Sequence, residues 1–229
     1  MQRIPEPELM TGLAQAGAYA AADFSASDQA FLERVQQLFP EGLGSRLLDL
    51  GCGPGNISFR LARSYPAATV LAVDGAPAML DLARGQLLQE LLRQPDLAER
   101  LRFVEAVLPD PALTCGASAV LSNSLLHHLH DPQVLWQAVA QLGAPGAFVY
   151  IQDLRRPASP DALEALVVSQ TQGAPEVLRH DYRASLHAAF TVREVREQLK
   201  CAVLACACLA GLQVAPRQER YLEVWGRLG

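Results

Sequence analysis

The chain has 229 residues, of which 50% are apolar and 19% are charged, and its formal net charge is -5. Such a composition predicts one globular domain with a sizeable core. The mild acidity offers no broad basic face to follow a phosphate backbone, so it argues against a nucleic-acid partner and favours small-molecule chemistry.

The N-terminal residues MQRIPEPELM contain prolines and acids where a secretory signal needs an apolar core, so we expect a cytoplasmic protein. The longest apolar stretch, Ala202 to Leu212, is too short to span a bilayer and argues against a membrane protein. None of the five cysteines forms a C-x-x-C pair, and three of them fall in the apolar segment CAVLACACLAG. We therefore expect buried thiols rather than metal ligands.

From residue 46 onward, apolar runs of strand length alternate with helical patterns, which predicts a parallel sheet covered by helices on both faces. Strands are expected over Arg46 to Leu50, Thr69 to Val73, Leu101 to Glu105, Ala119 to Ser122, and Ala147 to Gln152. Helices are expected over Ile57 to Ser64, Pro77 to Gln94, and Pro132 to Leu142. Pro145-Gly146 is expected to form a turn before the fifth strand.

The tail departs from this alternation. Helices are expected from Pro160 to about Gln172, from Pro175 toward Ala189, and after a capping box at Thr191 to Glu194. The last residues, LQVAPRQERYLEVWG, predict two short strands around a polar turn at Pro216 to Glu219. A hairpin after five parallel strands is not the usual end of a dinucleotide-binding domain.

Residues 47 to 56, LLDLGCGPGN, form a glycine-spaced turn directly after the first expected strand. Such a turn suits either a dinucleotide pyrophosphate or the amino-acid end of S-adenosylmethionine. The dinucleotide fingerprint requires glycine at the sixth position, where this chain has Asn56. Asp49 would repel a pyrophosphate but attract an ammonium or sulfonium group, so a cationic ligand fits better. Asp74, at the end of the second strand, is placed to accept ribose hydroxyls of either ligand.

Five segments occur in the order and spacing of class I S-adenosylmethionine-dependent methyltransferases: LLDLGCGPGN, VLAVDGAPAML, FVEA, AVLSNSLLHHLHDP and APGAFVYIQDLRRP. The resemblance covers about Arg46 to Pro157, and its middle is similar to methyltransferases of the ubiquinone and menaquinone pathways. It implies an α/β fold, with a Rossmann-like, doubly wound, mostly parallel seven-stranded sheet and a C-terminal antiparallel hairpin strand. It also implies a helical lid over residues 1–44, a methyltransferase domain over residues 45–229, and a helical substrate-side insertion over residues 155–190.

The resemblance implies roles for individual residues around the cofactor. Gly51, Gly53 and Gly55 would line the methionine moiety, with Asp49 at its amino group. Asp74 would bind the ribose. The adenine would lie among Gly75, Met79, Glu105 and Ala106, and the sulfonium would lie beside Ser122 and Asn123. On the acceptor side the expected contacts are Tyr19, Phe24, Asp153 and Arg155.

The histidine-rich stretch HHLH at 127 to 130 leaves a catalytic base and a structural role open. His127 and His128 are the candidate catalytic residues, since an imidazole can accept a proton at neutral pH. No second cluster of Asp, Cys or His is spaced to complete a metal site, so we expect none. The run from Arg179 to Arg183 is interpreted as a polar helix face, with a substrate wall as the alternative.

The expected reaction is an in-line displacement at the activated methyl carbon of S-adenosylmethionine, for which alignment is the main task. Ser122-Asn123-Ser124-Leu125 replaces the Asn-Pro-Pro-Tyr type of motif that cradles planar amines. Oxygen, carbon, sulfur and aliphatic nitrogen atoms of a small molecule therefore remain open as acceptors. The alternatives are a non-catalytic protein that binds S-adenosylmethionine or S-adenosylhomocysteine and, less favoured, a nicotinamide-dependent oxidoreductase.

Overall fold

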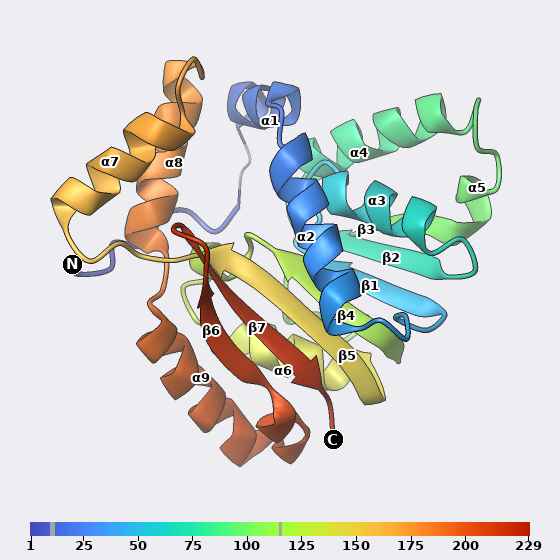
Figure 1. Ribbon diagram of the computed structural model, residues 1–229. Coiled ribbons are helices and arrows are strands. Elements are labelled where there is room, and N and C mark those ends of the chain that lie inside the picture. Colours follow the sequence, from blue (N-terminus) through green and yellow to red (C-terminus); the bar gives the residue numbers. More distant parts are fainter. Residues whose placement is uncertain (10–11, 115) are drawn as a thin grey trace.

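A computed structural model describes residues 1–9, 12–114 and 116–229. Seven strands form one sheet in the order β3-β2-β1-β4-β5-β7-β6 (Figure 1). The strands are β1 Arg46–Leu50, β2 Thr69–Asp74, β3 Leu101–Glu105, β4 Ala117–Asn123, β5 Gly143–Leu154, β6 Gln213–Arg217 and β7 Tyr221–Arg227. The first five pair in parallel, whereas β7 is antiparallel to both β5 and β6. The expected fold class is confirmed.

Helices cover both faces of the sheet. They are α1 Leu13–Ala21, α2 Ser25–Leu38, α3 Asn56–Ser64, α4 Pro77–Glu90, α5 Leu97–Arg100, α6 Gln133–Leu142, α7 Pro160–Gln170, α8 Glu176–Ala188 and α9 Val192–Ala205. Apolar residues of α2, α3 and α4 form one core with Leu47, Val70 and Ala72. Those of α6 and α9 form a second core with Leu48, Leu50 and Val73. Successive residues of β1 thus enter opposite cores, as a doubly covered strand requires.

The prediction that Pro145-Gly146 forms a turn before the fifth strand is wrong. The two residues lie within β5, which begins at Gly143. Ala117 pairs with Gly143 whereas Ala119 pairs with Phe148, so the strand bulges at this point instead of turning. Gly146 adopts a φ of +77°, which allows the extra residues to loop out without ending the strand. The expected capping box is present, with Thr191 and Glu194 each accepting from the other's backbone N–H at the start of α9.

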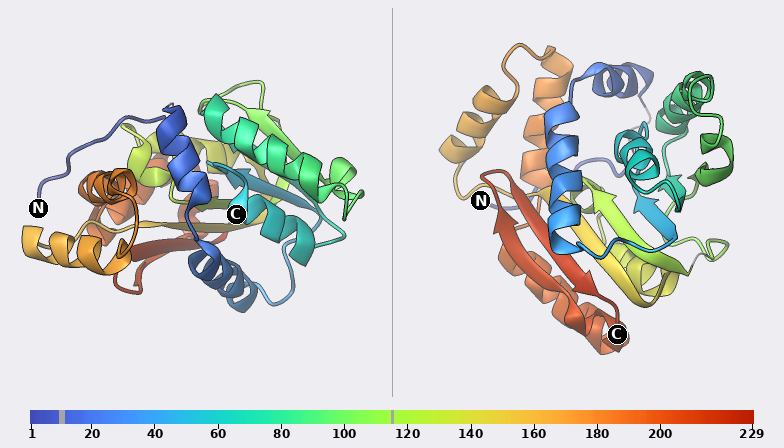
Figure 2. Two further views of the ribbon diagram at one scale, coloured as in Figure 1. Left: turned by 90° about the horizontal axis from the view of Figure 1, so that it is seen from above. Right: turned by 45° about the vertical axis from the view of Figure 1, so that its right-hand side comes forward.

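The helices outside the sheet gather at the carboxyl ends of the parallel strands. In Figures 1 and 2, α1 lies between α8 and α4, and it contacts both helices. The N-terminal residues run beneath α8, where the backbone N–H of Ile4 donates to the carbonyl of His187. Ligands of open α/β sheets bind at this edge, so these elements enclose the region where a site is expected.

Candidate active site

The glycine turn connects β1 to α3 and is tied to the neighbouring strand. The backbone N–H groups of Gly51 and Cys52 donate to the carbonyl of Val73, at 2.8 and 3.0 Å. Gly51, Gly53 and Gly55 all have positive φ, and α3 begins directly after Gly55. A Cβ at Gly55 would lie 2.9 Å from Cζ of Phe103, whereas a Cβ at Gly53 would meet nothing within 4 Å. Gly55 therefore serves close packing, and Gly53 leaves open space for a ligand.

A buried carboxyl group, that of Asp49, and a half-buried one, that of Asp74, lie beside this turn. Asp49 accepts a hydrogen bond of 2.6 Å from the hydroxyl of Ser58, and burial raises its pKa to about 7. Asp74 accepts from the backbone N–H of Gly53 and of Ala76, both at 2.8 Å. Burial raises the pKa of Asp74, while these backbone donors act to lower it. Because the glycine turn and the N-cap residue of α4 direct N–H groups toward Asp74, the carboxylate is fixed at the end of β2.

A cavity of about 830 Å³ opens in front of these groups. Its wall includes twelve of the residues that the sequence predicts: Asp49, Gly51, Gly53, Asp74, Gly75, Met79, Ala106, Asn123, Tyr19, Phe24, His127 and His128. They come from five separate parts of the chain, four of which follow parallel strands that end at one edge of the sheet. The volume lies in the upper part of the range of about 300–1,000 Å³ found for small-molecule sites.

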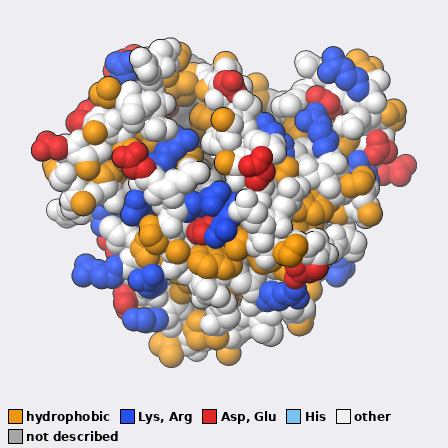
Figure 3. All heavy atoms as spheres, in the orientation of Figure 1, with side chains coloured by type: hydrophobic (Ala, Val, Ile, Leu, Met, Phe, Trp, Pro, Cys, Tyr) orange, Lys and Arg blue, Asp and Glu red, His pale blue; other side chains and the backbone are white. Residues whose placement is uncertain are grey.

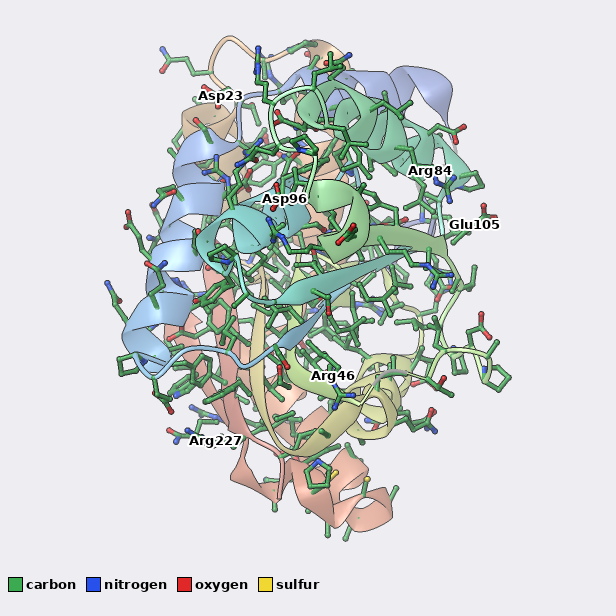
Figure 4. The ribbon with its side chains drawn as sticks, turned by 90° about the vertical axis from the view of Figure 1, so that its right-hand side faces the viewer. Asp23, Arg46, Arg84, Asp96, Glu105 and Arg227 are labelled. Atoms are coloured by element: carbon green, nitrogen blue, oxygen red, sulfur yellow. The ribbon has the colours of Figure 1, made fainter. Side chains whose placement is uncertain are left out.

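Five predicted residues do not line the cavity. Gly55 packs against Phe103. Glu105 is exposed, and Figure 4 shows it at the periphery of the molecule. Ser122 is fully buried and donates to the carbonyl of Leu50 at 2.8 Å. Arg155 donates to the carbonyl of Glu219 at 2.7 Å and so holds the turn of the terminal hairpin.

Asp153, the fifth of these residues, lies behind the cavity wall and holds His127. One of its carboxylate oxygens is 2.6 Å from Nδ1 of His127, and the other accepts from the backbone N–H of Leu126 at 2.7 Å. Burial alone would lower the pKa of His127, but the Asp153 carboxylate outweighs it and the pKa is raised. Burial and the neighbouring His127 hold the pKa of His128 well below its ordinary value.

Glu6, which is not among the predicted site residues, completes this group. Its Oε1 lies 3.5 Å from Nε2 of His127 and 3.4 Å from Nδ1 of His128. Glu6 is remote from the histidines in the chain and belongs to no motif, so no sequence signal indicates it. Asp181 and Tyr182 on α8 also line the cavity, so part of the run at 179 to 183 faces the site rather than solvent.

On the face shown in Figure 3, acidic and basic side chains are interspersed. Among the helices of the described ranges 1–9, 12–114 and 116–229, none is long and apolar enough to cross a membrane.

Comparison with known proteins identifies the class. The family described as "Methyltransferase domain" matches residues 48–149. The ubiquinone biosynthesis O-methyltransferase of Xanthomonas oryzae pv. oryzae is 30% identical over 179 residues, which cover 77% of this chain and 70% of that protein. The trans-aconitate 2-methyltransferase of Methylobacterium radiotolerans is 34% identical over 105 residues, which cover 46% of this chain and 36% of that protein.

The fold has solved counterparts. The plantazolicin methyltransferase BpumL, crystallised with a pentazolic desmethylPZN analog and S-adenosylhomocysteine, superposes with a TM-score of 0.66 at 16% identity. The match covers 95% of this chain and 90% of that chain. The chain belongs to the S-adenosylmethionine-dependent methyltransferases. It is an enzyme that methylates small molecules with S-adenosylmethionine as the methyl donor. The expected activity and cofactor are confirmed, in preference to a nicotinamide-dependent oxidoreductase or a non-catalytic binding protein.

Proposed function

We propose that the enzyme methylates an oxygen atom of a small molecule, with the acceptor held between the cofactor sulfur and the histidine pair. The observation that carries the proposal is the His127–Asp153 contact of 2.6 Å at the cavity wall. A hydroxyl arrives protonated and must lose its proton as the new bond forms, whereas a neutral amine needs no such help. Buried imidazoles fixed by a carboxylate are suited to an acceptor of the first kind. The ubiquinone biosynthesis relative is also an O-methyltransferase by name.

The cofactor residues are assigned by their position in the cavity. We infer that Gly51 and Gly53 admit the methionine moiety and that Asp49 faces its ammonium group. Asp74 would receive the ribose, and Met79 with Ala106 would flank the adenine. Glu105 is not assigned a contact, because its side chain is exposed. This arrangement directs the methyl group away from the glycine turn toward Asn123 and the histidines.

The acceptor end is built from elements outside the sheet. Tyr19 and Phe24, whose ring centroids lie 4.7 Å apart, cover the cavity from the N-terminal side. Tyr182 on α8 and Tyr221 at the start of β7 close the opposite side. These positions support residues 1–44 as a lid and residues 155–190 as a substrate-side insertion. Aromatic rings on a wall that also carries Glu6, the two histidines and Asp181 favour an acceptor with both an apolar and a polar part.

In the transfer, the bond between the methyl carbon and the sulfonium sulfur breaks while the oxygen–carbon bond forms. The cofactor leaves as neutral S-adenosylhomocysteine, and the hydroxyl proton passes to the histidine side of the cavity. Holding the two reacting atoms in line supplies on the order of 7–11 kcal/mol in well-oriented cases. His127 and His128 act on the acceptor, and Asp153 positions His127. The glycine turn and Asp74 act on the donor.

The four free cysteines of the described residues support a reducing compartment, in agreement with the expected cytoplasmic location. They are Cys52, Cys201, Cys206 and Cys208.

The proposal is tested by supplying S-adenosylmethionine with a deuterated methyl group to the protein in a metabolite extract. We expect labelled methyl ethers or esters, identified by mass spectrometry. Labelled amines, thioethers or C-methyl compounds in their place would contradict the oxygen acceptor. His127→Ala and His128→Ala should each lower product formation at least tenfold while S-adenosylhomocysteine still binds. His180→Ala, an exposed histidine on α8, is the matched control.

A further inference from the structure

We propose that Glu6, His127 and His128 bind a divalent transition-metal ion of the zinc type at the cavity wall. The three residues offer one oxygen and two nitrogen ligand atoms, which all lie within 4.8 Å of one another. Two histidines and one glutamate form a ligand set that holds catalytic zinc and leaves a fourth position open. Because all three residues line the cavity, that open position would face it.

The spacing of the ligand atoms fits such an ion. Glu6 Oε1 is 3.5 Å from His127 Nε2 and 3.4 Å from His128 Nδ1. Zinc binds nitrogen and carboxylate oxygen at about 2.0–2.2 Å, so two ligands at a tetrahedral angle lie roughly 3.3–3.5 Å apart. Two edges of the coordination tetrahedron are therefore already formed. The third edge, between the imidazole nitrogens, closes when the ion draws the rings together.

Two of these three atoms lack a hydrogen-bond partner in the described ranges. Within the described part of the chain, Glu6 Oε1 and His128 Nδ1 are buried and accept or donate no hydrogen bond. Buried polar atoms are almost always paired, because an unpaired one costs about 1–3 kcal/mol. A single proton would bridge only one pair of these atoms. A cation at their centre would satisfy all three.

The surrounding contacts orient the ligands. Asp153 lies 2.6 Å from Nδ1 of His127, so this nitrogen carries the hydrogen and the lone pair of Nε2 faces Glu6. A carboxylate on the far nitrogen of a metal-bound histidine is the usual second partner at such sites. The other oxygen of Glu6 accepts from the hydroxyl of Ser185 at 3.4 Å. Glu6 and Asp153 together also balance the two positive charges of the ion.

The catalytic role of the ion rests on the proposed oxygen acceptor, whereas its binding does not. An acceptor hydroxyl at the open position would bind the ion through oxygen and lose its proton more readily, as metal-bound water does. Asp181, whose Oδ2 is buried and without a partner among the described residues, lies at the same wall. With the ion bound, the two histidines serve as its ligands and not as the base, and Asp181 is placed to receive that proton or to bind a second group of the acceptor.

Metal binding is tested directly on the full-length chain after treatment with a chelator. The Sγ atoms of Cys206 and Cys208 lie 3.2 Å apart and could bind zinc themselves, so the background is the Cys206→Ser/Cys208→Ser variant. Zinc is titrated by calorimetry and Co²⁺ by absorption spectroscopy. We expect one ion per chain and a cobalt spectrum of nitrogen and oxygen ligands without a thiolate charge-transfer band.

Variants locate the site. Glu6→Gln and His128→Ala should each weaken zinc binding at least tenfold, and Asp153→Asn, a positioning residue, should weaken it about 10–100-fold. Glu8→Gln, on the same segment, and His180→Ala are matched controls and should bind zinc as the parent does. Retained binding of S-adenosylhomocysteine shows that each variant is folded.

Two results would overturn the proposal. Either the parent takes up no zinc at micromolar concentration, or Glu6→Gln and His128→Ala bind it as tightly as the parent. The cluster would then be a proton-sharing network. Failure of the oxygen acceptor is a separate outcome, because it is seen in the labelled products and leaves the zinc titration unchanged.

Discussion

Asp49 is the residue whose ionisation should govern how the cofactor end responds to pH. Its carboxyl is 1% exposed, and burial raises its pKa from 3.8 to about 7. The ammonium group of the cofactor favours the ionised form, so binding of S-adenosylhomocysteine should tighten by up to about tenfold between pH 6 and 8. Asp49→Asn should flatten this dependence in calorimetric titrations. Asp81→Asn, exposed on α4, should leave it intact, and an unchanged slope in Asp49→Asn would remove Asp49 from the binding reaction.

The same group has the opposite effect on the stability of the free protein. An acid with a raised pKa holds its proton more tightly in the folded state than in the unfolded state. Its contribution to stability is therefore complete below about pH 4 and is lost as pH rises toward the folded pKa of about 7. Urea unfolding of the parent should show this decline between pH 5 and 7. Asp49→Asn should show less of it, and an identical decline would assign the effect to other carboxyls.

Asp74 and Glu105 form a matched pair at the ends of adjacent strands. Asp74 accepts two backbone N–H groups and lines the cavity, whereas Glu105 is exposed. Asp74→Asn places an amide donor against one of these N–H groups and removes the charge. It should weaken S-adenosylhomocysteine binding at least tenfold by calorimetry. Glu105→Gln should bind normally, and a comparable loss there would restore its predicted contact with the adenine.

At the scale of elements, the glycine turn combines a ligand site with a packing contact. Gly55 has a φ of +91°, and a Cβ there would lie 2.9 Å from Phe103. Gly55→Ala should therefore lower the free energy of unfolding by roughly 2 kcal/mol or more. Gly85 lies inside α4, where a Cβ would meet nothing within 4 Å. Gly85→Ala should raise stability by about 0.5–1 kcal/mol, because alanine favours the helix. Equal urea midpoints for the two variants would refute this account.

The parallel strands were predictable because each is a short apolar run with glycine, proline or charge at its ends. Arg46–Leu50 and Leu101–Glu105 match the expected bounds, and the other three strands extend beyond them by one to four residues at an end. The bulge in β5 was not predictable from Pro145-Gly146, since a turn and a bulge use the same residues. What decides between them is the pairing of Ala117 with Gly143, which only the neighbouring strand supplies.

At the scale of the whole molecule, the site divides into a predictable half and an unpredictable half. The donor half follows from local motifs, since the turn, Asp74 and Ala106 each lie where a strand ends. The acceptor half depends on contacts between distant segments. Glu6 reaches the histidines because the N-terminal segment crosses the sheet edge, and Arg155 turns toward the hairpin instead of the cavity. Neither placement has a local sequence signal.

Arg3 holds the N-terminal segment in this position. Its Nε donates to the carbonyl of Ala188 at 2.6 Å, and one terminal nitrogen donates to the carbonyls of His127 and Leu129, both at 3.0 Å. The guanidinium also lies over the ring of Phe190, 4.0 Å from its centre. One side chain thus joins the N-terminal segment to the end of α8 and to the histidine loop.

Arg3→Ala should release this segment without disrupting the sheet. Charge-assisted hydrogen bonds contribute about 1.5–3 kcal/mol each, so we expect global stability to fall by a few kcal/mol at most, because water can reach the freed carbonyls. Amide hydrogen exchange should accelerate over residues 4–9 and 127–130, since Glu6 would no longer be held at the histidines. Exchange in β1 and β2 should stay slow. Arg102→Ala, exposed on β3, is the matched control. Unchanged exchange over both segments would mean that the N-terminal segment is held by other contacts, such as the hydrogen bond from Ile4 to His187.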